Sequence, residues 1–245
     1  MQLTDSDRHR LGALRTHVRR FGPKEVVTAE EARLNRVYWI ESGWAVRYRR
    51  LHNGDRQIVN FMLPGDFFDL QGLVQASSDH TVSAVSELTV IETAATDFIE
   101  AINDRPAIFN ALVWGAVVEE SILREHIIQI GRQPALSRIA FLILELYRRQ
   151  RMVGVAEEGR LDFPVGHGTL ADAVGLSRVH VSRSLRALRD RGCVAADDRH
   201  LRILDLEALE AIAEYDDRYL HIQPIPAREG RLFPAPGPGP LSNEQ

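Results

Sequence analysis

Between residues 21 and 93, short apolar runs alternate with turn residues. The runs are only three to five residues long, and glycine-containing turns such as residues 41–43 and 63–66 separate them. Many short strands at close spacing are typical of a β-sandwich or jelly roll. We therefore predict a β domain here. A short helix over residues 4–18 is expected before it, opened by a capping box of Thr4 and Asp7. The predicted strand runs are residues 37–40, 44–46, 57–61, 82–85 and 88–91.

A helical period replaces this pattern at Pro106. Apolar residues recur at three- and four-residue spacing as far as Gly131, with no proline inside, which predicts about six turns of amphipathic helix. One small domain offers little surface to bury so long a stripe, so we expect pairing with a second copy as a coiled coil. Packing of the whole stripe on its own β domain is the alternative. The predicted dimerisation residues are Leu112, Ala116, Leu123, Ile127 and Ile130.

Residues 169–192 predict two short helices joined at a glycine. Thr169 is expected to cap the first helix with Asp172 as its capping-box partner, and Ser177 to cap the second. Gly175 suits the left-handed backbone of a tight turn between them. On the second helix the residues predicted to face inward are Val181, Leu185 and Leu188. The pattern is that of a helix-turn-helix, which lays its second helix in the major groove of DNA.

The flanking segments fit this assignment. Residues 193–196 and 201–204 are predicted to be two strands around a polar turn, a β-hairpin wing suited to phosphate contacts. A helix over residues 136–150 precedes the motif, and Asp205 is expected to cap one more helix after the wing. The alternative is that the arginines form a solvated face and that the two helices only pack together. The predicted DNA-binding residues are Thr169, Ser177, Arg178, Val179, His180, Ser182, Arg183 and Arg186.

Charge is unevenly distributed along the chain. The formal net charge of the 245 residues is −4, but residues 132–204 hold thirteen arginines against eight acidic residues, a net charge of +5. The remainder therefore carries −9. A basic segment on an acidic body is expected of a module that binds a polyanion, and duplex DNA is the partner we expect.

Cysteine use and hydropathy restrict the remaining possibilities. Cys193 is the single cysteine, which excludes an internal disulfide and a four-cysteine iron–sulfur cluster within one chain, so we expect a buried structural thiol. The first ten residues are charged and do not resemble a signal peptide, and no apolar run approaches the ~18 residues of a spanning helix. We therefore expect a cytoplasmic protein without a membrane partner.

Sequence signatures of catalysis are missing. A jelly-roll metalloenzyme needs clustered histidines and carboxylates, but His52 and His80 stand alone and no H-x-H occurs in the β region. G-x-S-x-G, P-loop and G-x-G-x-x-G patterns are likewise missing. We expect neither an enzyme nor a metal site. A scaffold that does not bind DNA remains an alternative, which the salt dependence of DNA binding would distinguish.

Four motifs in this order resemble the Crp/Fnr family of bacterial transcription regulators. They are residues 40–43 (I-x-x-G), 63–67 (x-P-G-D-x-F), 136–140 (x-x-R-I-A) and 170–178 of the helix-turn-helix. The resemblance implies an α+β fold and a homodimer on a two-fold symmetric operator, with RNA polymerase as a further possible partner. The implied parts are a double-stranded β-helix (jelly-roll) sensor domain over 1–106, a dimerisation helix over 107–132, a winged helix-turn-helix domain over 133–222 and a disordered Pro/Gly-rich tail over 223–245.

The resemblance also bears on the effector. Family members that bind cyclic nucleotides carry a glutamate for the ribose and an arginine for the phosphate, but this chain has Leu70 and His80 at these positions. Leu123 and Arg124 replace the pair that would cap the base. Cyclic AMP is therefore not expected. Haem on His80, another small ligand or no ligand stay open, so the cofactor is unknown. The candidate effector-pocket residues are Leu70, Gln71, Gly72, His80, Thr81, Leu123 and Arg124.

On the second helix of the motif, Arg178 and Arg183 match positions at which family members contact bases or phosphates. Arginine can pair bidentately with guanine. Val179 departs from the family, because many members carry there a glutamate that accepts a hydrogen bond from cytosine. Valine can accept none, but it can contact a thymine methyl group. The operator is therefore expected to differ from the best-known one.

Overall fold

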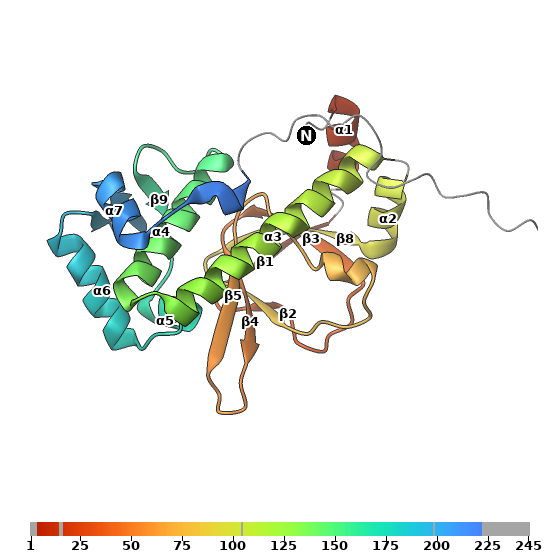
Figure 1. Ribbon diagram of the computed structural model, residues 1–245. Helices are drawn as coiled ribbons and strands as arrows, with labels where there is room; N and C mark the ends of the chain where they lie inside the picture. Colours follow the sequence, from red (N-terminus) through yellow and green to blue (C-terminus); the bar gives the residue numbers. More distant parts are fainter. Residues whose placement is uncertain (1–3, 15–16, 104, 198, 222–245) are drawn as a thin grey trace, which may run out of the picture.

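The computed structural model describes residues 4–14, 17–103, 105–197 and 199–221. A β domain and a mostly helical domain are joined by one long helix, α3 (Pro106–Arg132), which runs diagonally across the molecule in Figure 1. The predicted α+β architecture of jelly-roll domain, long helix and winged helix-turn-helix is confirmed. The tail predicted over residues 223–245 lies outside the described residues.

Two four-stranded antiparallel sheets form the β domain. One has the order β1-β8-β3-β6 and the other the order β2-β7-β4-β5. Alternate side chains of both sheets, such as Tyr38, Ile40 and Val82, fill the space between them. All five predicted strand runs are confirmed. The strands are β1 (His17–Phe21), β2 (Val26–Thr28), β3 (Arg36–Ser42), β4 (Ala45–Arg50), β5 (Arg56–Met62), β6 (Phe67–Phe68), β7 (Thr81–Ala84) and β8 (Leu88–Ala94).

The glycine of the I-x-x-G motif has a steric reason to be there. Gly43 lies between β3 and β4 with φ +82, and a Cβ atom at this position would stand 1.9 Å from the carbonyl oxygen of Glu87. A residue with a side chain would be strained at this φ angle, and its Cβ atom would clash with the Glu87 carbonyl oxygen.

Two short helices and a 3₁₀ turn complete the β domain: α1 (Asp5–Ala13), α2 (Ala95–Asn103) and η1 (Leu70–Leu73). The predicted capping box of Thr4 and Asp7 is confirmed at the start of α1. The predicted extent of this helix was wrong, because α1 ends at Ala13 and Val18 belongs to β1, where it pairs with Ile91 of β8. Sheet pairing therefore outweighs the local helical spacing.

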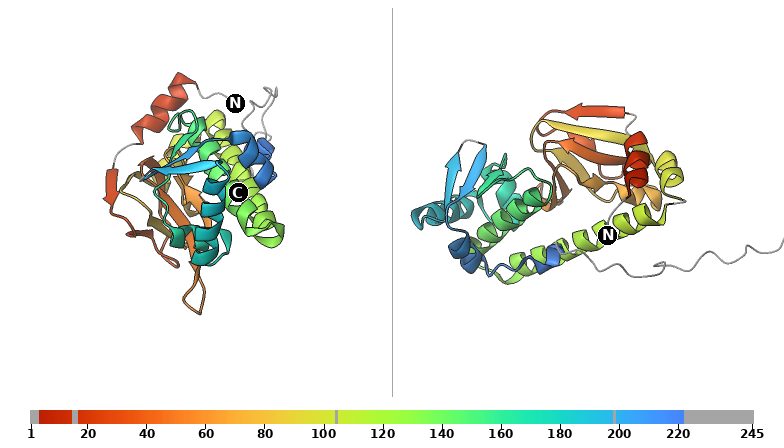
Figure 2. Two further views of the ribbon diagram at one scale, coloured as in Figure 1. Left: turned by 90° about the vertical axis from the view of Figure 1, so that its left-hand side faces the viewer. Right: turned by 90° about the horizontal axis from the view of Figure 1, so that it is seen from above.

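The 27-residue helix α3 has the predicted extent, and its stripe is largely uncovered. Seen from above in Figure 2, both domains lie on the same side of α3. Ile127 is 72% exposed, and Ala116 is exposed too. By length and composition α3 could also cross a membrane, and 17% of its most apolar 18-residue window is buried. The expectation that no apolar run approaches this length was therefore wrong, since an 18-residue window of α3 is apolar enough.

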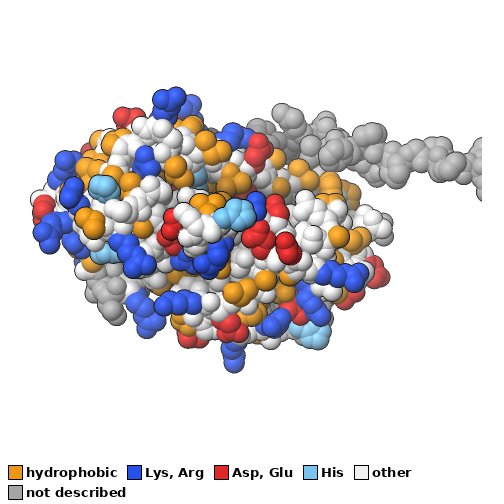
Figure 3. Space-filling model, turned by 90° about the horizontal axis from the view of Figure 1, so that it is seen from below, with side chains coloured by type: hydrophobic (Ala, Val, Ile, Leu, Met, Phe, Trp, Pro, Cys, Tyr) orange, Lys and Arg blue, Asp and Glu red, His pale blue; other side chains and the backbone are white. Residues whose placement is uncertain are grey.

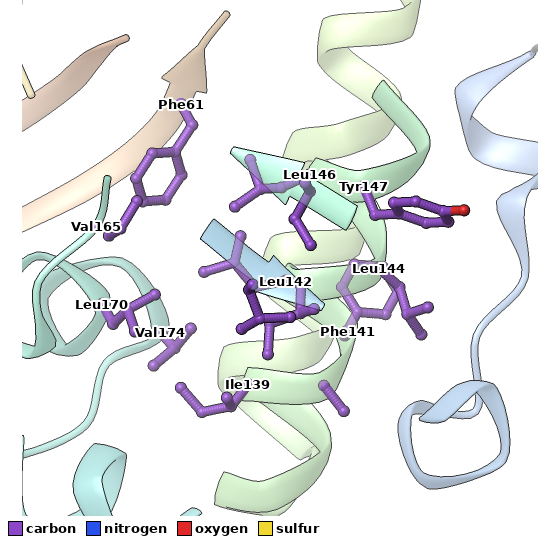
Figure 4. Close-up of a cluster of buried hydrophobic side chains, with 14 of the residues drawn as sticks. Phe61, Ile139, Phe141, Leu142, Leu144, Leu146, Tyr147, Val165, Leu170 and Val174 are labelled. Carbon is purple, nitrogen blue, oxygen red and sulfur yellow. The ribbon is translucent and has the colours of Figure 1, made fainter. Parts of the chain in front are cut away.

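The second domain begins with α4 (Ala135–Met152), confirming the helix predicted over 136–150. Its core continues into the β domain: Figure 4 shows Phe61 of β5 beside Val165, facing the side chains of α4. The two domains therefore share one hydrophobic cluster. The remaining elements are β9 (Arg160–Asp162), α5 (His167–Val174), α6 (Arg178–Asp190), β10 (Val194–Asp197), β11 (His200–Ile203), α7 (Leu206–Ala213) and η2 (Asp217–Leu220).

Candidate nucleic-acid interface

Helices α5 and α6 form the predicted helix-turn-helix. Gly175 ends α5 in the left-handed conformation with φ 64 and ψ 42. The Ser177 hydroxyl caps α6 by accepting a hydrogen bond from the backbone N–H of His180 at 3.3 Å. The predicted cap at Thr169 was wrong: α5 begins at His167, Gly166 holds the cap position without a side-chain hydrogen bond, and Thr169 lies half-buried inside the helix.

The outer face of α6 carries the predicted DNA-binding residues. Val181, Leu185 and Leu188 are buried, as predicted. Figure 3, seen from below, shows Lys and Arg side chains gathered on the left part of the molecule, where α6 lies in Figure 1. This face offers cations and polar groups to a polyanion. The residues exposed on it are Ser177, Arg178, Val179, His180, Ser182, Arg183 and Arg186.

His167 and Gly168, the first residues of α5, contact this face of α6. The sequence analysis did not predict these contacts. A Cβ atom on Gly168 would lie 3.2 Å from Nε of Arg178, so the guanidinium rests closely over the glycine backbone. Nδ1 of His167 lies 2.9 Å from the Ser182 hydroxyl. These contacts restrict the orientation of the Arg178 and Ser182 side chains. Neither His167 nor Gly168 gave a signal of this role in the sequence.

A three-stranded wing of order β10-β11-β9 stands beside the motif. The hairpin of β10 and β11 was predicted, and β9 adds an edge strand by pairing Leu161 with Leu201. Cys193, just before β10, is 1% exposed, and burial raises the pKa of its thiol. The expected structural thiol is therefore confirmed, and Asp205 caps α7 as predicted by accepting from the N–H of Ala208 at 2.9 Å.

The β domain holds α5 directly through strand β5. Nε of Arg56 donates to the Asp172 carboxylate at 2.5 Å, and Nε2 of Gln57 donates to the Ala173 carbonyl at 3.1 Å. Asp172, predicted as a capping partner of Thr169, therefore binds the other domain instead. The first helix of the DNA-binding motif is thus fixed to the sensor domain.

A second, buried polar junction joins β5, α3 and α4. His126 of α3 donates from Nε2 to the fully buried Glu145 carboxylate of α4 at 2.9 Å, and its Nδ1 lies 3.3 Å from the Val59 carbonyl of β5. Arg149, one turn after Glu145, lies 3.5 Å from it and binds the Asp66 carboxylate at 2.7 Å. The junction thus ties the sensor sheet, the long helix and the first helix of the DNA-binding domain together.

Electrostatics favour the charged state of this junction. Burial alone would lower the pKa of His126, but the attraction and hydrogen bond of Glu145 outweigh it, so the pKa of His126 is raised. Burial would raise the pKa of Glu145, but His126 and then Arg149 outweigh it, so the pKa of Glu145 is lowered. A signal was present in the sequence: Glu145 interrupts a run of apolar residues on α4, which indicates a buried carboxylate with a partner.

The candidate effector residues surround a buried carboxylate. Asp69 is completely buried and its side chain accepts a 2.6 Å hydrogen bond from the Thr28 hydroxyl. Nε2 of the buried His80 stands 3.4 Å from the other Asp69 oxygen, and Nδ1 lies 2.7 Å from Asp79. Both ring nitrogens thus face carboxylates. Among the candidates, Leu70, Gln71 and Gly72 form η1, and Thr81 starts β7 beside His80.

The side chains around Asp69 do not suit cyclic nucleotides or haem as ligands. A buried carboxylate repels the phosphate of a cyclic nucleotide, and His80 has both nitrogens directed at acidic groups instead of an open iron position. Arg124 pairs with Glu120 and Ser121 of its own helix, and Leu123 is half-buried on the same helix. The donor set therefore fits neither cyclic AMP nor haem.

Comparison with known proteins gives matches along both domains. The model of the cyclic nucleotide-binding domain matches residues 18–105, and that of the Crp-like helix-turn-helix domain matches residues 137–212. The nitrogen fixation regulation protein FixK of Rhizobium meliloti is 31% identical over 202 residues, which cover 78% of this chain and 88% of the relative. The transcriptional activatory protein AadR of Rhodopseudomonas palustris is 29% identical over 213 residues, covering 86% and 87%.

Among solved structures, FixK2 from Bradyrhizobium japonicum has the same fold, with a TM-score of 0.73 at 24% identity over 80% of this chain and 96% of that one. The fold, the arginine-bearing helix-turn-helix and the relatives define a DNA-binding transcription regulator with an attached sensor domain. The chain belongs to the Crp/Fnr family. The resemblance drawn from the four motifs is thereby confirmed.

Proposed function

We propose that two copies of this chain pair along α3 and place their two α6 helices in successive major grooves of a two-fold symmetric operator. The observation that carries this proposal is the outer face of α6, where seven predicted DNA-binding residues are all exposed beside the three-stranded wing. One helix reads only a few base pairs, so presenting it twice raises affinity and specificity together.

The uncovered stripe of α3 supports the dimer. Exposed apolar surface of this extent needs a cover in water, and a helix with apolar residues at heptad-like spacing finds it in its own copy. Leu112, Leu123 and Ile130 are half-buried within one chain, whereas Ala116 and Ile127 are exposed. A helix partner would bury all five.

The partners follow from this arrangement. The protein acts by binding and not by catalysis, and its target, chromosomal DNA, places it in the cytoplasm. AadR and FnrL are named as transcriptional activators, so we include RNA polymerase as a second partner. The candidate effector residues that we described fit neither cyclic AMP nor haem. The sensor domain is joined to α5 by the Arg56–Asp172 contact and to α4 by the His126–Glu145 junction, and control of the DNA-binding domain passes through these contacts in our proposal.

Selection of bound duplexes from a random DNA pool tests the proposal. We expect an enriched palindrome whose half-sites lie about one helical turn apart, bound by two chains, with binding that weakens steeply as salt rises because several phosphates are neutralised. Sequence-independent binding, or a site bound by one chain, contradicts the two-fold arrangement.

Replacing Ile127 by aspartate should convert the dimer to monomers. The side chain is 72% exposed in one chain, so the substitution leaves the monomer fold intact but buries a charge in the predicted interface. Sedimentation and an operator mobility shift measure the two effects. Ile128→Asp is the matched control, because Ile128 is 47% exposed on the flank of the stripe. A dimer that survives in Ile127→Asp places the interface elsewhere.

A further inference from the structure

The last two carbonyl groups of α5 receive hydrogen bonds from side chains that lie outside the helix-turn-helix. Nε2 of Gln57, on β5, donates to the Ala173 carbonyl at 3.1 Å, and Nη1 of Arg138, on α4, donates to the Val174 carbonyl at 3.1 Å. The last carbonyls of a helix lack partners within the helix itself. The β domain and α4 therefore cap α5 together, directly before the turn that leads into α6.

Arg138 also caps the long helix. Its Nε donates to the carbonyl of Gln133, the C-cap residue of α3, at 2.7 Å. One guanidinium thus bridges the C-terminal ends of α3 and α5, where the helix dipoles favour a positive charge. Its rigid planar fork can hold two carbonyl oxygens in fixed directions, whereas a lysine ammonium is a point charge on a flexible stem. The orientation of α5 relative to α3 therefore depends on this arginine.

The turn of the motif packs against the end of the long helix at the same place. A Cβ atom on Gly175 would lie 3.4 Å from Cγ2 of Ile130, in the last turn of α3, and 3.8 Å from Nη1 of Arg138. Only residues 175–177 separate the end of α5 from the first residue of α6. A shift of α5 against α3 is therefore passed to α6 over a very short connection.

From this geometry we infer that Arg138 and Gln57 are positioning residues that set the separation of the two α6 helices in the dimer, and with it the half-site spacing that the protein accepts. The inference rests on the proposed function, in which α3 lies at the two-fold axis. Symmetry repeats any displacement of α6 in the second chain, so the separation changes by twice that displacement. Both side chains are half-buried and lie outside the exposed face of α6, so they act without contacting bases.

Mobility shifts on duplexes whose half-sites are moved together or apart by one and two base pairs test the inference on the full chain. Each base pair shifts a half-site by about 3.4 Å and turns it by about 34° around the duplex. We expect the wild type to bind its selected operator at least about tenfold more tightly than either neighbouring spacing. This preference should fall below about threefold in Arg138→Gln. Arg138→Lys, which keeps the charge but not the fork, should lie between the two.

A second variant and a control separate positioning from loss of structure. Gln57→Ala removes the other cap of α5 from a different element and should relax the spacing preference too. Arg132→Gln removes the same charge at an exposed position in the last turn of α3 and should keep the wild-type preference. Each affinity is divided by that for the variant's own best spacing, because a loss of folded protein lowers binding to all duplexes equally. Sedimentation verifies the dimers.

The outcomes distinguish this inference from the proposed function. A wild type that binds every spacing equally contradicts the two-fold arrangement, and the inference fails with it. A wild type with a clear preference that the folded, dimeric Arg138→Gln, Arg138→Lys and Gln57→Ala variants all retain overturns the inference alone.

Discussion

Replacing Arg183 by alanine should weaken binding to the selected operator by at least about 30-fold while the dimer persists. A bidentate arginine–guanine contact contributes about 1–3 kcal/mol of discrimination, and a symmetric dimer loses two such contacts. Arg183 is exposed on the second turn of α6, so its removal leaves the core of the motif untouched. A mobility-shift titration at fixed salt measures the loss, and sedimentation verifies the dimer.

Arg189→Ala is the control for this experiment. Arg189 is exposed on the same helix but in its last turn, whereas a recognition helix contacts bases with its N-terminal residues. Its loss should cost little affinity and should leave discrimination between operator and random DNA unchanged. Should Arg183→Ala bind the operator as tightly as the wild type, Arg183 does not belong to the recognition surface.

Removing the carboxylate of Glu145 should lower the free energy of unfolding by about 3–5 kcal/mol, the cost of leaving a buried charge without its partner. In Glu145→Ala both His126 and Arg149 lose a buried counter-charge. Chemical denaturation measures the change. Glu210→Ala is the matched control, since Glu210 pairs with Arg148 of the same helix at a partly exposed site and should cost under about 1 kcal/mol.

The same junction predicts a pH dependence. The raised pKa of His126 means that the pair stabilises the fold below the ordinary value of 6.5, and that this stabilisation is lost as pH rises through the folded-state pKa. The lowered pKa of Glu145 means that the stabilisation contributed by its carboxylate is present above pH 4.5. This stabilisation is lost as pH falls through the folded-state pKa of Glu145. The stability difference between the wild type and His126→Gln should therefore be largest between about pH 4.5 and 6.5 and should shrink as pH rises through the folded-state pKa of His126. A difference that grows with pH contradicts the charged pair.

The sequence predicted those features that follow from local periodicity and turn chemistry. The strand runs, the long helix, the turn at Gly175 and the Ser177 cap depend on residues close together in the chain, and all are confirmed. The inward stripe of α6 fixes by elimination which of its side chains face outward. Whether those side chains bind DNA stays a prediction.

Features that depend on distant parts of the chain escaped this reasoning. Asp172 had a plausible local role as a capping partner, but Arg56, 116 residues earlier, binds it. Nothing in the sequence places His126 against Glu145 or Arg178 over Gly168. The first contact forms where α3 packs against α4, and the second where α6 packs against α5. The extent of α1 was misjudged for the same reason, since the pairing of β1 with β8 is non-local.

The core shared by the two domains bears on engineering. Because Phe61 of β5 packs with Val165 and α4, and Arg56 holds α5, the sensor cannot be exchanged for another by cutting the chain within or near α3. A chimaeric regulator made in that way would place an unmatched β5 strand against this DNA-binding domain. The hydrophobic side chains at the boundary between the two domains would then lose their packing partners. A chimaera that functions has to keep the β4–β5 hairpin together with the DNA-binding domain.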